Sequence, residues 1–196
     1  MHRTDLSPDP LTQFALWFRA ADDAGLHPRA MTLATATPDG IPSARMVLLK
    51  DYDAHGFTFF TNYESQKGRE LAQNPHAALV FYWLPQDRQI RITGTIAKLT
   101  QAESDEYFQT RPRGSQIATW VSQQGTVVEN RAILEARYEE FVAQFGDDPI
   151  VRPRYWGGYR LTPHALEFWQ AGEHRLHDRF RYTRQGEEWL LERLAP

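Results

Sequence analysis

The stretch AMTLATATPDGIPSARMVLLKDYDAHGFTFFT, residues 30–61, decides the fold. It alternates runs rich in Thr, Val, Leu and Phe, which favour strands, with two short groups of turn residues. The first group is Pro38-Asp39-Gly40, and the second spans residues 53–56. Tight turns of this kind join antiparallel neighbours, so the stretch predicts a hairpin followed by a third strand. The expected strands are residues 30–37, 43–50 and 57–61.

Strand character returns on both sides of a turn at Pro85-Gln86-Asp87 and again in the last third of the chain. These expected strands are residues 76–84, 88–99, 155–161, 165–170, 178–183 and 189–194. Helical spacing and capping residues predict helices over residues 10–25, 64–73, 101–111, 115–121 and 130–145. Closely spaced strands joined by tight turns indicate an antiparallel barrel rather than a β-α-β sheet. The expected fold is mainly β, with peripheral helices, in a single domain over residues 1–196.

The composition is that of a globular protein, with 41% hydrophobic and 24% charged residues among 196. A net charge of −3 gives no general attraction to nucleic acid or anionic lipid, so any anion site must be local. The absence of cysteine excludes disulfides, thiolate zinc sites and cysteine nucleophiles. No apolar run approaches the ~20 residues that span a bilayer. We therefore expect a cytoplasmic protein with neither a nucleic-acid nor a membrane partner.

Signatures of several other site classes are missing. No G-x-G-x-x-G follows a strand and no Walker loop occurs, which argues against Rossmann or P-loop nucleotide binding. Gly157-Gly158 stands alone and is predicted to form a tight turn. His174 and His177 are three residues apart, but on a strand they would face opposite ways, and no carboxylate cluster completes a metal site. No metal is expected.

Basic residues recur beside Gln, Ser, Thr and aromatic residues at four places. They are Arg45 and Lys50 in RMVLLK, Lys67 after Ser65, Arg111 and Arg113 before Ser115, and Arg175 and Arg179. Two bound phosphomonoesters, each carrying about −1.5 to −2 charges, would require such cation sets. Arg45 and Lys50 have opposite strand parity, so they point to opposite faces unless a bulge or the strand end intervenes. We expect them to serve different ligands.

The stretch EFWQAGEHRLHDRFR, residues 167–181, carries the densest group of candidate site residues. If RLHDR within it forms a strand, period-two alternation puts its three basic side chains on one face: Arg175, His177 and Arg179. Their mutual repulsion would be relieved by an anionic ligand, and Arg forks suit phosphate oxygens. Trp156 and Trp169, just upstream, are expected to supply a flat apolar wall for a ring.

Ordered sequence blocks over nearly the whole chain resemble the pyridoxine (pyridoxamine) 5′-phosphate oxidase family. The blocks are DLxxDPL at 5–11, RxVLLK at 45–50, FFTN at 59–62, RQ at 88–89, YFxxRPRxSQI at 107–117, WVSxQ at 120–124 and the C-terminal FWQxGEHRLHDRFxY. HRLHDRF is the most specific of them. The resemblance implies an FMN-binding split barrel that forms a homodimer, with residues 153–196 carrying the oxidase signature and FMN at the subunit interface.

The resemblance also implies a role for individual residues. The implied FMN-binding residues are Arg45, Met46, Val47, Leu48, Leu49, Lys50, Phe60, Thr61, Gln66, Lys67, Gln89, Gln124, Gly125, Trp169 and Arg179. Of these, Gln89, Gln124, Trp169 and Arg179 would come from the other subunit. The implied substrate-binding residues are Lys50, Tyr107, Arg111, Ser115, Arg175, Leu176 and His177, with Arg175 and His177 catalytic. The implied reaction transfers hydride from C4′ of a phosphorylated B6 vitamer to FMN, which O₂ reoxidises with release of hydrogen peroxide.

Three departures from the family pattern bear on cofactor and substrate binding. Gln66 stands where Arg is usual, which removes one cation near the FMN phosphate. Gly125 replaces a usual Ser and so removes a hydroxyl donor. Only four residues precede the DLxxDPL block, so the basic segment that can fold over the substrate is expected to be absent, with poorer exclusion of water.

Two alternatives remain open from the sequence. A phenazine-biosynthesis-type flavin oxidase shares the flavin motifs, although the spacing of Tyr107, Arg111 and Ser115 favours a phosphorylated substrate. A non-catalytic flavin or pyridoxal-phosphate binder on the same fold would carry yellow cofactor without consuming oxygen.

Overall fold

The computed structural model describes residues 1–196, and its elements follow the predicted order. The helices are α1 (Pro10–Asp23), α2 (Gln66–Gln73), α3 (Gln101–Gln109), α4 (Arg113–Val121) and α5 (Arg131–Phe145). The strands are β1 (Ala30–Ala36), β2 (Pro42–Leu48), β3 (Asp51–Asp53), β4 (Gly56–Asn62), β5 (His76–Trp83), β6 (Arg88–Lys98), β7 (Trp156–Gln170), β8 (Asp178–Gln185) and β9 (Glu188–Leu194). Short 3₁₀ turns are η1 (Arg3–Asp5), η2 (Leu84–Gln86) and η3 (Glu173–Arg175).

Helix starts are fixed by side chains that accept hydrogen bonds from free backbone N–H groups. Asp9 accepts from the Thr12 N–H at 2.7 Å, and Pro10 occupies the first helical position of α1. Thr100 and Glu103 form a reciprocal capping box at α3. Each such cap stabilises its helix by about 1 kcal/mol, which explains why these starts could be predicted from sequence.

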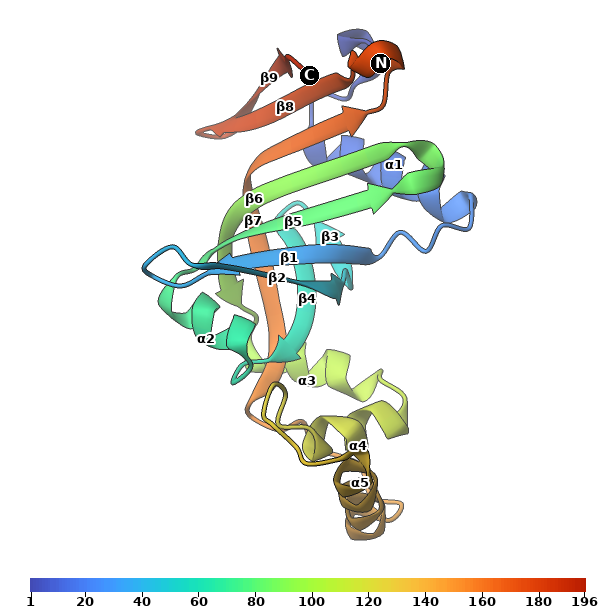
Figure 1. Cartoon of the computed structure of the whole chain (residues 1–196), viewed down its shortest axis with the longest axis vertical. Helices are drawn as coiled ribbons and strands as arrows, with labels where there is room; N and C mark the ends of the chain where they lie inside the picture. The colour runs from blue at the N-terminus through green and yellow to red at the C-terminus, as the bar shows by residue number, and fades with distance from the viewer.

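All strand pairs are antiparallel and form one curled sheet in the order β2-β1-β5-β6-β7-β4-β3, with β8 and β9 added beside β7 (Figure 1). β6 runs along one edge of β7, while the other edge is shared. β4 pairs with the first half of β7 and β8 pairs with its second half. The sheet therefore divides at β7, and the expected antiparallel split barrel is confirmed.

β7 is one continuous strand, although the sequence predicts two strands over residues 155–170. The register shifts opposite β6, where Gly94 pairs with Pro163 and Thr93 pairs with Ala165, leaving His164 as an extra residue. Pro163 cannot donate a backbone hydrogen bond, and the β-bulge accommodates it without ending the strand.

The predicted turn at Gly157-Gly158 is also wrong. Both glycines lie within β7, where they pair with Thr61 and Phe60 of β4. A Cβ added at Gly157 would lie 2.2 Å from the hydroxyl oxygen of Tyr63. The glycines thus allow a side chain to approach the strand closely, and they do not turn the chain.

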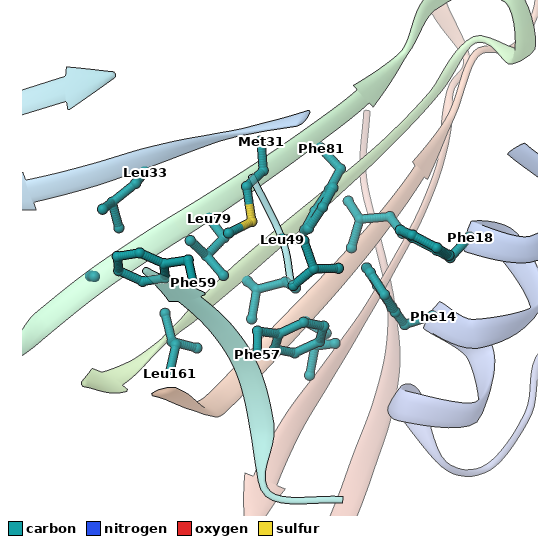
Figure 2. Packing of buried hydrophobic residues seen from close by; sticks show 14 of the residues in the cluster. Phe14, Phe18, Met31, Leu33, Leu49, Phe57, Phe59, Leu79, Phe81 and Leu161 are labelled. Carbon is teal, nitrogen blue, oxygen red and sulfur yellow. The ribbon is translucent and has the colours of Figure 1, made fainter. Parts of the chain in front are cut away.

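The main core fills the curl of the sheet and is covered on one side by α1 (Figure 2). Phe14 of α1 is fully buried, with ring centroids 4.8 Å from Phe57 and 5.2 Å from Phe81. Truncating such a ring to Ala costs about 3–5 kcal/mol, so this contact anchors the helix.

A second, smaller core lies where the first residues of β7 meet the helices α3 and α4. Its buried members are Phe108, Ile117, Val121, Ile150 and Trp156. α5 lies at the far end of the molecule (Figure 1), buries no residue completely and packs its half-buried apolar side against this cluster. The small core places α3 and α4 beside β4.

Candidate active site

A cavity of about 490 Å³ opens between β2, β4 and the start of α2. It is lined by every predicted FMN-binding residue except Leu49, Gln89, Trp169 and Arg179, with Ser65 as the one addition. Leu49 is fully buried in the main core. The fold thus gathers segments from residues 45–50, 60–67 and 124–125 around one space.

Arg45 enters this cavity from β2 with its guanidinium held by oxygen atoms. Its nitrogens lie 2.5 Å from the hydroxyl oxygens of both Thr35 and Ser43, and 3.5 Å from Glu70 of α2. Both hydroxyls in turn donate to the Glu70 carboxylate, at 2.5 and 2.6 Å. Gln66 donates its amide to the other oxygen of Glu70 at 2.9 Å.

Glu70 is 6% exposed, so its charge is stabilised by these neighbours rather than by water. Burial acts to raise the pKa of Glu70, but hydrogen bonds from Ser43, Thr35 and Gln66, together with the Arg45 charge, bring it below its ordinary value. The carboxylate is therefore ionised at neutral pH.

Lys67 lies in the first turn of α2 and is also buried. Its ammonium donates to Ser65 Oγ at 3.2 Å and to Gln124 Oε1 at 3.1 Å. Burial and then the nearby Arg45 charge lower the pKa of Lys67, because both disfavour a second cation here. An anion in the cavity would offset this cost.

Gln124 lies on the same protomer's cavity, which corrects the expectation that the other subunit supplies it. Its Oε1 accepts from both Lys67 and Thr61, the latter at 3.3 Å. With the oxygen occupied, its amide N–H groups are left to donate toward the cavity. The neighbouring Gly125 has φ +93°, a backbone conformation that L side chains rarely adopt.

Lys50 lies beyond the end of β2, so the strand-end alternative resolves its parity relative to Arg45. Its backbone N–H donates to Thr58 O at 2.9 Å. Lys50 borders the large cavity and also a second cavity of about 260 Å³ that contains Tyr107. Its ammonium lies 6.0 Å from the Tyr107 ring centre.

A stack of aromatic rings lies beside these spaces, with one ring each from β4, α3 and β7. The Phe60 ring lies 3.8 Å from Tyr107 and 5.4 Å from Trp156, centroid to centroid, and nearly parallel to both. Phe60 lines three cavities: the two described above and a third of about 270 Å³. All three spaces therefore meet at one ring.

The third cavity contains Arg111 and Ser115. Arg111 donates to Thr119 Oγ1 at 2.6 Å, and its guanidinium carbon lies 4.5 Å from the Trp156 ring centre. Burial lowers the pKa of Arg111, but a guanidinium remains charged at neutral pH. The cavity thus holds one fixed cation beside a hydroxyl.

The C-terminal segment does not form the predicted strand over RLHDR. Residues Glu173–Arg175 form η3, His174 and Arg175 have φ of +54° and +64°, and β8 begins only at Asp178. Arg175 and His177 therefore lie in the connection between β7 and β8, where strand alternation does not apply. Left-handed backbone at two successive non-glycine residues stores about 1–3 kcal/mol each, a kind of strain that clusters at functional sites.

His177 is held by contacts within the same chain. Its Nδ1 accepts a hydrogen bond from the Gly172 N–H at 3.2 Å, so the neutral ring carries its proton on Nε2. The imidazole centre lies 4.7 Å from the Trp169 ring. Leu176, between the two candidate catalytic residues, is 72% exposed and borders a 400 Å³ cavity with His177.

Three of the residues expected from the other subunit form one row across the sheet. Gln89 of β6 pairs with Trp169 of β7, which pairs with Arg179 of β8. Arg179 is clamped by Glu167, which accepts from two of its nitrogens at 2.8 and 2.9 Å. These three residues form a continuous row within one protomer, but none of them lines a cavity that contains Phe60.

Within one protomer, the predicted residues thus fall into two groups at opposite ends of β7. The strand has 15 residues, or up to roughly 45 Å at about 3.3 Å per residue. Trp156 belongs to the Phe60 end and Trp169 to the other, so they do not form one wall. The cavity containing His177 shares no residue with the three that meet at Phe60.

Sequence reasoning missed Glu70, Thr119 and Glu167, which hold Arg45, Arg111 and Arg179 in place. One signal was present: Glu70 follows Gln66 by four residues, so these two side chains lie on the same side of α2. No helix is both long and apolar enough to cross a membrane, and no three His, Asp or Glu side chains cluster as metal ligands.

Two family models match the chain. Residues 19–145 match the family described as "Pyridoxamine 5'-phosphate oxidase", and residues 156–196 match the "Pyridoxine 5'-phosphate oxidase C-terminal dimerisation region". A pyridoxine/pyridoxamine 5′-phosphate oxidase of Paraburkholderia phymatum is 56% identical over 195 residues, covering 98% of this chain and 92% of its own. The Burkholderia mallei protein of the same name is 55% identical over 196 residues, covering 98% and 91%.

Solved structures show the same fold. PhzG from Burkholderia lata, in complex with tetrahydrophenazine-1-carboxylic acid, superposes with a TM-score of 0.93 at 36% identity, covering 98% of this chain and 95% of its own. A pyridoxamine 5′-phosphate oxidase-related, FMN-binding protein from Nostoc punctiforme superposes with a TM-score of 0.77 at 18% identity, covering 97% and 100%.

Proposed function

Because the chain belongs to the pyridoxamine 5′-phosphate oxidase family, we propose that it oxidises pyridoxine 5′-phosphate and pyridoxamine 5′-phosphate to pyridoxal 5′-phosphate. One observation carries the proposal. Three cavities meet at Phe60, and two of them hold separate sets of cations, Arg45 with Lys67 in one and Arg111 in the other. Such an arrangement suits two phosphorylated molecules that share an aromatic contact.

The residues of the largest cavity suit FMN. Arg45 and Lys67 supply two cations for the phosphate, and the raised cost of keeping Lys67 charged would be relieved by that dianion. Phe60 and the β2 residues around Met46 and Val47 supply apolar surface for the ring. When bound, FMN would accept a hydride from the substrate and pass the electrons to O₂, giving hydrogen peroxide.

The substrate phosphate is assigned to Arg111 and Ser115, with Lys50 and Tyr107 closing the adjoining space. Thr119 and the Trp156 face hold the Arg111 guanidinium, so its orientation is set before a ligand arrives. Pyridoxine 5′-phosphate, the alcohol substrate, loses two hydrogens to become the aldehyde pyridoxal 5′-phosphate. The amine becomes an imine, which takes up water and releases ammonia.

The reacting end is assigned to a second copy of the chain, because Arg175 and His177 lie at the other end of β7. In a homodimer, these residues and the Gln89–Trp169–Arg179 row of the partner subunit would cover the ring. His177 would donate from Nε2 to the substrate, and the Arg175 charge would attract its polar groups. Together they would exclude water from the reacting carbon.

The outer face of the sheet supports this dimer. Met46, Leu48 and Tyr82 are 63%, 52% and 52% exposed, and Thr32 pairs across the sheet with both Met46 and Val80. Large apolar side chains on an open sheet face indicate a contact surface. In a two-fold dimer the same face meets itself, which can bring the β2 edge of one subunit to the β6–β8 region of the other.

A phenazine-type oxidation is the second candidate, favoured by the likeness to PhzG at 36% identity. It would not require the cation and hydroxyl of Arg111 and Ser115 to bind phosphate. A phosphorylated substrate gives both groups a role, so the vitamer reaction is preferred.

Purified protein tests the proposal directly. The released flavin is identified by chromatography, and peroxide is followed with both phosphorylated vitamers and with their dephosphorylated forms. We expect FMN, and peroxide only from the phosphorylated compounds. A protein that keeps FMN but produces no peroxide from either vitamer would favour the phenazine-type enzyme or a carrier.

A further inference from the structure

We propose that Glu70 is a positioning residue that sets the affinity for the flavin phosphate from behind the cavity wall; this inference rests on the proposed function. Glu70 does not line the 490 Å³ cavity, whereas Arg45 and Gln66, which it binds, both do. Its carboxylate is therefore placed to act through these residues and not on the ligand itself.

The contacts around Glu70 form a closed network. The Thr35 and Ser43 hydroxyls each accept from Arg45 and donate to Glu70, so each bridges the two charged groups. A hydroxyl has one proton, and the carboxylate fixes its direction toward Glu70. The hydroxyl lone pairs are then aimed at the guanidinium. The carboxylate thus orients Arg45 both directly and through two bridges.

Burial makes this network costly to disturb. Glu70 is 6% exposed and Thr35 is 3% exposed, so water cannot replace a lost partner. Without the carboxylate charge, both hydroxyls can rotate and Arg45 loses its counterion. A long cation freed in this way must be ordered again when phosphate binds, which weakens binding.

The same network accounts for the side chain at position 66. Gln66 reaches back four residues along α2 to Glu70, so its amide is engaged within the helix. Glu70 also offsets one of two neighbouring cations, the half-buried Arg45 and the buried Lys67, that would repel each other in the flavin-free protein. The site is thereby kept folded and ordered before the cofactor arrives.

Riboflavin separates an effect on the phosphate site from a general effect, because it carries the same ring without the phosphate. Both flavins are titrated into the flavin-free full-length protein, and binding is followed by quenching of flavin fluorescence. For Glu70→Gln, we expect the Kd for FMN to rise about tenfold or more, as for loss of a charged hydrogen bond. The Kd for riboflavin should change less than about twofold.

Three outcomes for Glu70→Gln would overturn the inference: an equal rise in the Kd values for FMN and riboflavin, an unchanged Kd for FMN, or tighter FMN binding. Glu192→Gln is the control, because Glu192 pairs with Arg181 on the distant β8–β9 hairpin at 3.0 Å. It should change neither Kd.

If Glu70→Gln does not fold, Ser43→Ala decides the question, because Ser43 bridges Arg45 and Glu70 without lining the cavity. It should weaken FMN binding about threefold to fivefold and leave riboflavin binding unchanged. Failure of the proposed function is distinguishable, because it would show as FMN binding by the unaltered protein without peroxide from either phosphorylated vitamer, whatever the Kd values of the variants.

Discussion

The two ends of β7 differ in how completely one protomer builds its site. At the Phe60 end, Arg45, Lys67 and Arg111 are each held by named oxygen partners, and the cavities are formed by elements of a single chain. At the other end, Arg175 sits in a left-handed turn and Leu176 is mostly exposed. The cations of the first region are therefore oriented within one protomer. At the second region, Arg175 and Leu176 are exposed at the surface.

This difference indicates a division of labour. Residues that hold phosphates can be fixed early, since a phosphate is the same in every flavin and vitamer. Under the proposed function, residues that act on the reacting carbon would be brought to it by a second subunit, so chemistry would be coupled to assembly. Variants at each end should therefore fail in different ways.

The largest effect is expected for Arg175→Ala. Turnover should fall at least about 100-fold, because a positioned charge at the reacting end is lost, while bound FMN is retained. Peroxide production and the visible flavin spectrum measure the two quantities separately. Arg184→Ala, an exposed Arg packed on Trp189 at the end of β8, is the control and should behave normally. Normal turnover in Arg175→Ala would show that the C-terminal end does not act in the reaction.

Arg45→Ala should instead loosen the cofactor. Loss of a cation on the phosphate is expected to raise the Kd for FMN roughly 100-fold, and excess FMN should restore turnover. Arg69→Ala provides the matched control on α2, because its guanidinium bonds only to the Glu64 backbone oxygen, outside the cavity. If turnover stayed low at saturating FMN, Arg45 would affect the reaction as well as cofactor binding, and the two ends of β7 would not have separate roles.

Gln66→Arg should strengthen FMN binding at the Phe60 end. A guanidinium at this position can pair with Glu70 and still reach the cavity, so the Kd for FMN should fall about fivefold. The gain should shrink between about 50 mM and 0.5 M salt, since screening weakens exposed charge interactions. A salt-independent change would point to packing rather than charge.

Gly125→Ser is expected to have the smallest effect. The serine hydroxyl could add a hydrogen bond of about 1 kcal/mol, but φ +93° imposes strain of similar size on any L side chain. The Kd for FMN should change less than about threefold. A larger gain would mean that the loop adjusts its backbone when the side chain is added.

Local signals in the sequence predicted most of the fold. Asp9, Thr100 and Asn130 mark helix starts because caps act over three residues, and alternation placed the strands of the hairpin at residues 30–50. Prediction failed where distant contacts decide. Gly157 is a strand residue because Tyr63 packs on it, and no local pattern records that contact.

The site shows the same division. The structure gathers Arg45, Lys67 and Gln124 of one protomer around one cavity, whereas the family resemblance implied that Gln124 comes from the other subunit. The geometry of Arg175 was missed, because the φ of +64° arises from closing the β7–β8 connection rather than from a preference of Arg. Glu70 was overlooked because a carboxylate on a short helix is usually solvated, and only the fold reveals its burial.

The change of partner along β7 has a consequence for spacing. One edge of this strand passes from β4 to β8, so a single strand carries both groups of residues. In the proposed homodimer, the length of β7 would set the distance between these two groups of residues. Inserting two residues into β7 would preserve which side chains face each side of the sheet, yet would lengthen the strand by about 6.6 Å. A subunit with such an insertion should still bind FMN at the Phe60 end. Its Arg175 and His177 would be displaced from the substrate of the neighbouring subunit.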